Sequence, residues 1–378
     1  MPGPLALVLV ELAIFGFFVA FMKSDSMYVL VSLILLAGAG LYGFRRHHTL
    51  RETIAGAFST HRWLSYLVFF GCIFSIPFIF RDSAYLIHIC VMAALYSIIA
   101  MGLNFTLGSA NMTHFASSAF FGIGAYAAAL LSIHLHTGFW MNIFLASACT
   151  AVFGFLQAIP ILKTKTYYLA LVTMAFGLIF YQFVITVHFT GGPAGLLGIP
   201  YPKVFGLELV NPLHIFGVEL PFQSNFLYLV VIFAFLAMVC ARRIHNSWIG
   251  MTWNYIREDE IAAKCQGINV SGAKLLAFTF DAAFAGFAGT FYAHYISYIG
   301  PPNADIMISV MVVIMVILGG MDNVTGVILG AVLLTVLPEK FRVFQQFRLT
   351  IYGVIVLAML ILRPNGLLPK RVRTHQRA

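Results

Sequence analysis

Long apolar runs recur along the whole chain. PLALVLVELAIFGFFVAFM (4–22) and NFLYLVVIFAFLAMVCA (225–241) each approach the ~20 residues that a helix needs to cross a bilayer. The pattern predicts an all-α polytopic membrane protein with about 11–12 transmembrane helices. The apolar segments are 4–22, 27–44, 63–80, 84–107, 118–134, 138–162, 167–189, 225–241, 275–297, 306–319, 323–337 and 348–363.

Composition supports this class. Of the 378 residues, 61% are hydrophobic and only 9% are charged. The mean hydropathy of +0.93 excludes a pair of water-soluble domains. The first apolar run has no basic residues before it and no small-residue cleavage site after it, so it is predicted to remain as an anchor.

The distribution of Lys and Arg predicts the orientation. With the N-terminus inside, loops 45–62, 163–165 and 242–274 and the tail 363–378 face the cytoplasm. They hold 4, 2, 5 and 5 Lys and Arg residues, or 16 of the chain's 22. Both termini are therefore predicted to be cytoplasmic, and the net charge of +9 reflects this bias and anionic headgroups, with no sign of nucleic-acid binding.

Two apolar stretches are interrupted by Gly and polar residues. GLNFTLGSANMTHFASSAFFGIGAY (102–126) and LGGMDNVTGVILGA (318–331) predict discontinuous segments near 108–118 and 318–325. Irregular backbone at membrane depth lines a cavity or a protein interface. Paired broken segments in the two halves favour an inverted-repeat permease core with a pathway between the repeats. Two ordinary short loops are the alternative.

The stretch IREDEIAAKCQGINV (256–270) is the densest polar part of the chain. Acidic residues at 258–260 suit the start of a short helix, and Gly267 suits its end. Ile261, Ala262 and Ala263 give a small apolar surface, which predicts a helix that rests in a groove on another protein. An interfacial helix on the lipid surface is the alternative, but the acidic start and the lack of large aromatic residues disfavour it.

Catalytic motifs are missing from the sequence. It contains no Walker loop, no HExxH and no GxSxG, so the chain is predicted not to be an enzyme. The GIG at 122–124 lies in an apolar run, where small residues let helices approach closely. The five cysteines show no CxxC spacing, and neither a disulfide framework nor a metal site is predicted.

Four collinear blocks resemble one family. GLNFTLG with FFGIGAYAAALL, TYYLALVTMAFGLIFYQ with TGGPAGLLGIP, the block around IREDEIAAKCQGINV, and VVIMVILGGMDNVTGVILGAVLLTVLPEKFR are similar to the M-type permease subunit of branched-chain amino-acid ABC transporters. The resemblance implies a permease core over 81–365. Residues 1–80 then form an N-terminal extension of about three transmembrane helices, and 366–378 form a basic cytoplasmic tail.

The resemblance also implies partners. The chain would work in the bacterial inner membrane with a second, homologous permease, two ATP-binding subunits and an external substrate-binding protein. ATP and Mg would be bound by the ATPase subunits, and no cofactor by this chain. The helix in 256–270 would be the coupling helix that transmits ATPase closure, with a contact set comprising Arg257, Glu258, Asp259, Glu260, Ala262, Ala263 and Gly267.

The first broken segment departs from the family's usual G-Q-L-S-L-G-H-A pattern. Met112, His114 and Ser117 stand where the family usually has Gln, Ser and His. The change either alters the cargo or reflects drift in a loop whose side chains matter little. The candidate translocation-pathway residues are Asn104, Asn111, Met112, His114, Ser117, Asp281, Asp322 and Asn323.

Asp281 is a functional candidate because intramembrane carboxylates are costly. Alternatively it snorkels, or pairs with Lys274 on the same helix.

The leading hypothesis is an ATP-driven importer permease for branched-chain amino acids or a related small polar solute, such as an amide, urea or a short organic acid. The alternative is a self-contained ion-coupled secondary transporter that uses Asp281 and His114. A scaffold or membrane enzyme is disfavoured by the missing catalytic motifs.

Overall fold

The computed structural model describes 4–24, 62–161, 166–204, 207–215 and 218–340, together with 29, 32, 350, 353–354, 357, 361 and 366–368. The chain divides into two compact units. The first comprises Met1–His88 with Leu213–Ser224, and the second comprises Ile89–Pro212 with Asn225–Ala378. Each unit is described by itself below.

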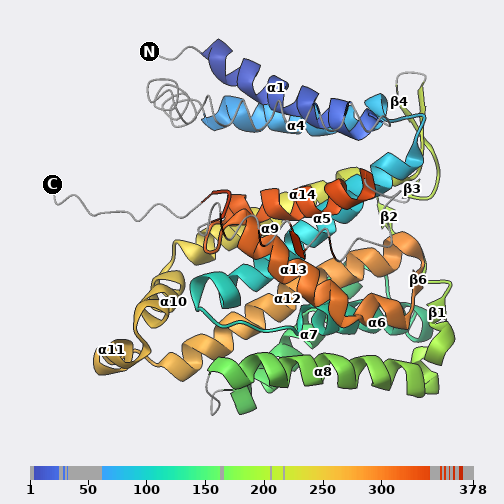
Figure 1. Ribbon diagram of the computed structural model, residues 1–378. Helices are drawn as coiled ribbons and strands as arrows, with labels where there is room; N and C mark the ends of the chain where they lie inside the picture. The colour runs from blue at the N-terminus through green and yellow to red at the C-terminus, as the bar shows by residue number, and fades with distance from the viewer. Residues whose placement is uncertain are drawn as a thin grey trace. The chain divides into compact units, whose positions relative to one another are not determined.

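Helices dominate the described residues (Figure 1). Each predicted apolar segment that falls on them coincides with a helix, whereas most of 27–44 and most of 348–363 lie outside them. The helices are α1 (Pro4–Lys23), α4 (Arg62–Ile79), α5 (Ala84–Leu103), α6 (Ser117–His134), α7 (Phe139–Ile161), α8 (Thr166–Thr186), α9 (Gln223–His245), α10 (Trp248–Glu258), α11 (Glu260–Cys265), α12 (Val270–Ile296), α13 (Ile306–Gly319) and α14 (Val324–Lys340).

Six helices of the described residues are long and apolar enough to cross a membrane. They are α5 with its extension to Ser109, α6, α7, α8, α9 and α12. The helices α13 and α14 are apolar but shorter. The prediction of an all-α polytopic membrane protein is therefore confirmed.

In the first unit, α1 packs against α4. Glu11 is an acidic residue within the apolar α1, and its Oε1 accepts a hydrogen bond from Ser65 Oγ of α4. This contact satisfies one oxygen of a carboxylate that would otherwise lie unpaired among apolar side chains. A short antiparallel hairpin, β4 (Leu213–Ile215) with β5 (Val218–Leu220), belongs to the same unit.

In the second unit, α12 is the central helix and packs along both α6 and α7 (Figure 1). Small residues let these backbones approach closely. A Cβ on Gly124 of α6 would lie 2.3 Å from the Cα of Gly286 in α12, and one on Gly154 of α7 would lie 2.3 Å from the Cβ of Ala282. The packing role predicted for the GIG at 122–124 is thus confirmed at Gly124.

The loop after α8 contains short irregular elements. Two 3-10 turns, η2 (His188–Thr190) and η3 (Gly192–Ala194), precede β1 (Leu196–Leu197), which pairs with β6 (Tyr298–Ile299) after α12. A hairpin of β2 (Lys203–Val204) and β3 (Leu207–Glu208) follows, and a third 3-10 turn, η4 (Pro301–Ala304), precedes α13. The β1–β6 pair joins this loop to the end of α12.

Both predicted interruptions are present. The helix α5 continues into a π-helix, η1 (Asn104–Ser109), and residues 110–116 have no regular structure before α6 begins. The helices α13 and α14 are separated by a turn at 320–323, where Asp322 has a positive φ of 67°. The inverted repeat itself stays a prediction.

Candidate functional site

The π-helix η1 presents polar side chains inside an otherwise apolar region. All six of its residues are buried. Widened helical turns of this kind are rare and occur frequently at functional sites. Two of its side chains, Asn104 and Ser109, bond to Asp322, and a third, Thr106, lies against His114 and Asp281. The broken end of α5 therefore supports two separate polar clusters.

The first cluster, here called the Asp322 cluster, comprises Asn104, Gly108, Ser109, His245, Arg257 and Asp322. Asp322 Oδ1 accepts from Ser109 Oγ at 2.8 Å and lies 3.3 Å from His245 Nδ1. Arg257 NH1 lies 3.7 Å from Asp322 Oδ2 and donates to the Gly108 carbonyl at 2.8 Å. The fully buried carboxylate is thus faced by a permanent cation from α10 and by an imidazole from α9.

Gly108 makes this cluster possible. The backbone N–H of Asp322 donates to Asn104 Oδ1 at 2.8 Å, directly beside Gly108. A Cβ on Gly108 would lie 2.1 Å from that oxygen and 2.6 Å from the Asp322 nitrogen. The bond between the two discontinuous segments therefore requires a residue without a side chain at 108.

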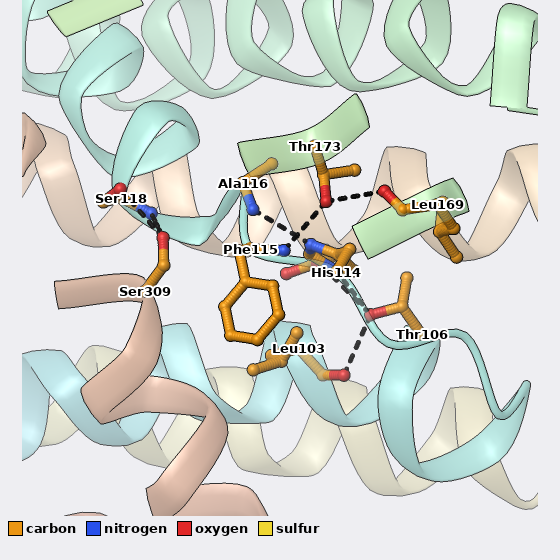
Figure 2. Close-up of polar contacts among 10 residues, drawn as sticks. Leu103, Thr106, His114, Phe115, Ala116, Ser118, Leu169, Thr173 and Ser309 are labelled. Atoms are coloured by element: carbon orange, nitrogen blue, oxygen red, sulfur yellow. Dashed lines mark hydrogen bonds and ion pairs between the residues drawn. The ribbon is translucent and has the colours of Figure 1, made fainter. Parts of the chain in front are cut away.

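The second cluster is a buried pair. His114 Nε2 lies 2.5 Å from Asp281 Oδ2 of α12, and both side chains have no exposed surface. Thr106 Oγ1 lies 2.9 Å from His114 Nε2 and 3.2 Å from Asp281 Oδ2, as well as 2.9 Å from the Leu103 carbonyl. Figure 2 shows the Thr106 hydroxyl in contact with both the His114 ring and the Leu103 carbonyl.

The segment that carries His114 is fastened to neighbouring helices on two sides (Figure 2). The backbone N–H of Phe115 donates to Thr173 Oγ1 of α8 at 3.0 Å. The backbone N–H of Ser118 donates to Ser309 Oγ of α13 at 2.8 Å. These bonds fix the irregular backbone at 114–118, so the position of the His114 ring is determined by α8, α12 and α13 together.

The polar stretch predicted as one helix forms two. The helix α10 ends at Glu258, and Asp259 caps α11 by accepting from the N–H groups of Ile261 and Ala262 at 2.8 and 3.0 Å. Gly267 closes α11 with a φ of 78°, while its N–H bonds to Lys264 and that of Ile268 bonds to Ala263. This Schellman motif requires the left-handed backbone that glycine adopts freely.

The end of α11 is exposed, whereas α10 is anchored. Ile261 is 74% exposed, although it is a large apolar residue. Trp253 of α10 is fully buried and its Nε1 donates to the Ala273 carbonyl at 2.8 Å, while its ring lies 5.6 Å from that of Phe105 in η1. Figure 1 shows α10 and α11 at one end of the helices they connect.

Glu260 connects α11 to α12. Its Oε2 accepts from Lys274 Nζ at 2.7 Å, and its Oε1 lies 3.1 Å from Lys264 Nζ. The hydrogen bond from Lys274, assisted by Lys264, lowers the pKa of Glu260 below the ordinary value for a glutamate. Lys274 therefore pairs with Glu260, and the alternative that it pairs with Asp281 is wrong.

The structure brings together some of the predicted pathway residues and separates others. Asn104 bonds to Asp322, and His114 contacts Asp281. Asn111 is exposed with a φ of 54°, whereas Met112 is buried. Ser117 is buried and its hydroxyl has no hydrogen-bond partner among the described residues. Asn323 caps α14 and donates to the Leu368 carbonyl at 2.8 Å.

In the predicted coupling set, Arg257 and Ala263 are directed inward, and the other members surround the exposed end of α11. Arg257 bonds to Gly108, and Ala263 is buried. Sequence reasoning missed Thr106, Ser109 and His245 as members of the two clusters. The signal for Thr106 and Ser109 was a hydroxyl side chain within an apolar run. Nothing in the sequence pointed to His245. The described residues contain no group of three His, Cys, Asp or Glu side chains placed to hold a metal.

Comparison with known proteins now identifies the family. A family model described as the permease component of the branched-chain amino acid transport system matches residues 85–363. The chain belongs to this family. The high-affinity branched-chain amino acid transport system permease protein LivM of Salmonella typhimurium is 37% identical over 296 residues, covering 75% of this chain and 70% of LivM. LivM of Escherichia coli is 35% identical over 303 residues, covering 77% and 71%.

No solved structure matches the chain. Family membership confirms the resemblance carried by the four sequence blocks and establishes a permease role for the chain. The family match begins at residue 85, so α1 and α4 precede it.

Proposed function

We propose that this chain is the membrane permease subunit of an ATP-driven importer for branched-chain amino acids or a related small polar solute, such as an amide, urea or a short organic acid. The relatives' names supply the substrate class. The observation that carries the ATP-driven mechanism is the end of α11, where an exposed Ile261 stands on a helix that is capped at both ends. An apolar residue presented in this way suits a groove on a partner protein.

The proposed partners are a second homologous permease, two ATP-binding subunits and an external substrate-binding protein. ATP and Mg would be bound by the ATP-binding subunits, and the chain would lie in the bacterial inner membrane with both termini in the cytoplasm. The positive-inside bias supports this orientation, because α10 and α11 lie in the loop with most Lys and Arg of any loop between helices.

The contacts of α10 suggest how a push on α11 reaches the pathway. Trp253 packs α10 against η1 and α12, and Arg257 connects it to Gly108 and Asp322. Moving α10 as a rigid body would therefore displace the broken end of α5 and the α13–α14 turn together. Such a displacement of packed elements between two discrete arrangements is a common form of switching.

Substitution of Ile261 by Glu tests this mechanism. Full-length permease carrying Ile261→Glu is expressed with its partner subunits, and co-purification and substrate-stimulated ATP hydrolysis are measured. We expect loss of the ATP-binding subunits or at least a tenfold loss of stimulated hydrolysis, with an unchanged melting temperature. Leu135→Glu is the matched control. Leu135 is 66% exposed, but it directly follows the C-terminal end of α6 and does not belong to α11.

Equal hydrolysis in the two variants would contradict the coupling role of α11. The contact between His114 and Asp281 is the observation that favours the alternative of a self-contained ion-coupled transporter. That alternative predicts uptake by this chain alone, driven by an ion gradient in the absence of ATP. Uptake by the purified chain without ATP-binding subunits would therefore favour it.

A further inference from the structure

Among the described residues, no positive charge balances the His114–Asp281 pair. His114 Nδ1 accepts from the backbone N–H of Ala116 at 3.3 Å, so this nitrogen carries no proton. The contact assigns the neutral tautomer, with the proton on Nε2 directed at Asp281 Oδ2. The ring is then uncharged, and an ionised Asp281 would leave one net negative charge in the pair.

No other cation compensates Asp281. Among the described residues, His114 is the only ionisable side chain at ion-pair distance from it. Arg257 is engaged with Gly108 and Asp322, and Lys264 and Lys274 are engaged with Glu260. The titratable and charged groups on the surrounding elements are Tyr85, His88, Cys90 and Tyr96 on α5, Tyr126 and His134 on α6, Cys149 on α7, Tyr168 and Tyr181 on α8, Tyr255, Arg257 and Glu258 on α10, Glu260, Lys264 and Cys265 on α11, and Lys274, Tyr292, His294 and Tyr295 on α12.

Aromatic rings surround the buried pair. The His114 ring lies 4.8 Å from the ring of Phe278 and 6.4 Å from that of Phe120. Asp281 Oδ1 is buried and has no hydrogen-bond partner among the described residues, and a Cβ on Gly102 would lie 3.1 Å from it. Burying an uncompensated carboxylate costs far more free energy than burying a neutral carboxylic acid.

We propose that the His114–Asp281 pair is a proton-binding site of this permease, with the bound proton on the carboxyl group of Asp281. The proton comes from a hydronium ion of the solution: one O–H bond of hydronium breaks, one O–H bond forms on the carboxylate, and a water molecule is released. Because the pair has no exposed surface in this conformation, the proton exchanges only when a conformational change admits water. Proton binding to the pair does not depend on ATP, whereas its effect on the transport rate rests on the proposed function.

Infrared spectroscopy tests the site directly. Full transporter in lipid nanodiscs, without ATP, is examined at neutral pH for the carbonyl band of protonated carboxylic acids. We expect the difference between wild type and Asp281→Asn to contain one such band. Asp322→Asn is the matched control, because Asp322 is equally buried but faces Arg257 and His245, and it is expected to leave the band unchanged.

A second variant keeps the test decisive if Asp281→Asn fails to fold. His114→Gln changes the partner of Asp281 but retains the Asp281 carboxyl group. The band is therefore expected to persist at a shifted frequency. Absence of the band in wild type, its persistence in folded Asp281→Asn, or an unshifted band in His114→Gln would each overturn the proposal.

The functional consequence is measured separately. Substrate-stimulated ATP hydrolysis by the full transporter is expected to fall as pH rises. Loss of the proton from Asp281 would oppose return to the conformation in which the pair is buried. This pH dependence is expected to flatten in Asp281→Asn. If the transporter hydrolyses no ATP at any pH, the proposed function fails, while the infrared band still decides whether the pair binds a proton.

Discussion

Asp322 and Asp281 are both buried carboxylates beside the same π-helix, but their electrostatic surroundings differ. Asp322 faces Arg257 and His245 and accepts from Ser109. Asp281 faces His114 and a threonine hydroxyl, and its second oxygen has no hydrogen-bond partner in the part of the chain that the structure describes. A buried carboxylate with a cation can stay ionised, whereas one without a cation is more stable as the acid. The two sites therefore combine the same buried side chain with different expected charges: Asp322 is ionised, and Asp281 is neutral.

The comparison also separates two roles. The Asp322 cluster includes Arg257 of α10, next to the proposed coupling helix, so its charges connect that helix to the broken segments. The His114–Asp281 pair lies between the irregular segment and α12, among aromatic rings. One site is suited to transmitting movement, and the other is suited to responding to water and protons.

The largest expected effect is on the ion pair at Asp322. Arg257→Met removes the cation and leaves the carboxylate with His245, and breaking a buried pair in this way is strongly destabilising. Because Arg257 is 32% exposed, we expect a smaller loss than for a fully buried pair. The free energy of unfolding in nanodiscs should fall by about 2–3 kcal/mol. Thermal melting measures it, with Arg243→Met, on the exposed surface of α9, as the control.

Adding Asp322→Asn to Arg257→Met should recover part of this loss, because the double variant no longer contains an unpaired charge. Equal melting temperatures for Arg257→Met and Arg243→Met would show that Asp322 does not depend on the guanidinium.

Steric substitutions beside the two carboxylates provide the next test. Gly108→Ala places a Cβ 2.1 Å from Asn104 Oδ1, whereas Gly102→Ala places one 2.8 Å from Phe284 Cβ and 3.1 Å from Asp281 Oδ1. Overpacking of this kind costs about 1–3 kcal/mol. We expect Gly108→Ala to lie at the upper end and to reduce transport more than Gly102→Ala does. The reverse order would indicate that the Asn104–Asp322 bond is dispensable.

Isosteric substitutions compare the charges themselves. Asp322→Asn loses hydrogen bonds that involve charged groups and is expected to cost about 1–3 kcal/mol. Asp281→Asn replaces a carboxyl group that is already neutral, so a cost below about 1 kcal/mol is expected. Chemical or thermal unfolding of the two variants at neutral pH gives both values. A larger cost at Asp281 would mean that this carboxylate is ionised.

The smallest effect concerns the exposed carboxylate at the start of α11. The pKa of Glu260 is lowered by Lys274, so its stabilising contribution is present above the ordinary glutamate pKa and is lost as pH falls through the folded-state pKa. Glu260 is 39% exposed, and screening limits the effect to about 0.2–1 kcal/mol. The melting difference between wild type and Glu260→Gln should shrink on acidification. A constant difference would exclude the ionic contribution.

Much of the fold could be predicted because hydropathy is a local property. Each apolar segment on described residues became a helix, and both polar interruptions became irregular segments. The short polar helix was predicted with its end at Gly267, where the left-handed backbone is observed. Its division into α10 and α11 was not predicted, because Asp259 was interpreted as part of a helical start and not as a cap between two helices.

The candidate site was predicted only in part. His114 and Asp281 were each selected as unusual polar residues, and Asn104 and Asp322 were selected from the broken segments. Their pairing could not be inferred, because it depends on how α5, α12 and the α13–α14 turn pack. The same holds for Lys274, which lies two turns from Asp281 along α12 but bonds to Glu260 of the preceding helix.

The sequence by itself determined that this protein is a helical membrane permease of the branched-chain amino-acid transport family, because the length of the apolar segments and the order of the motifs are properties of the linear sequence. Only the tertiary structure decided which buried carboxylate receives a cation. That outcome depends on side chains from distant segments meeting within a few ångströms, since a buried charge is offset only by a partner close enough to form an ion pair with it. Arg257 reaches Asp322, and no cation among the described residues reaches Asp281.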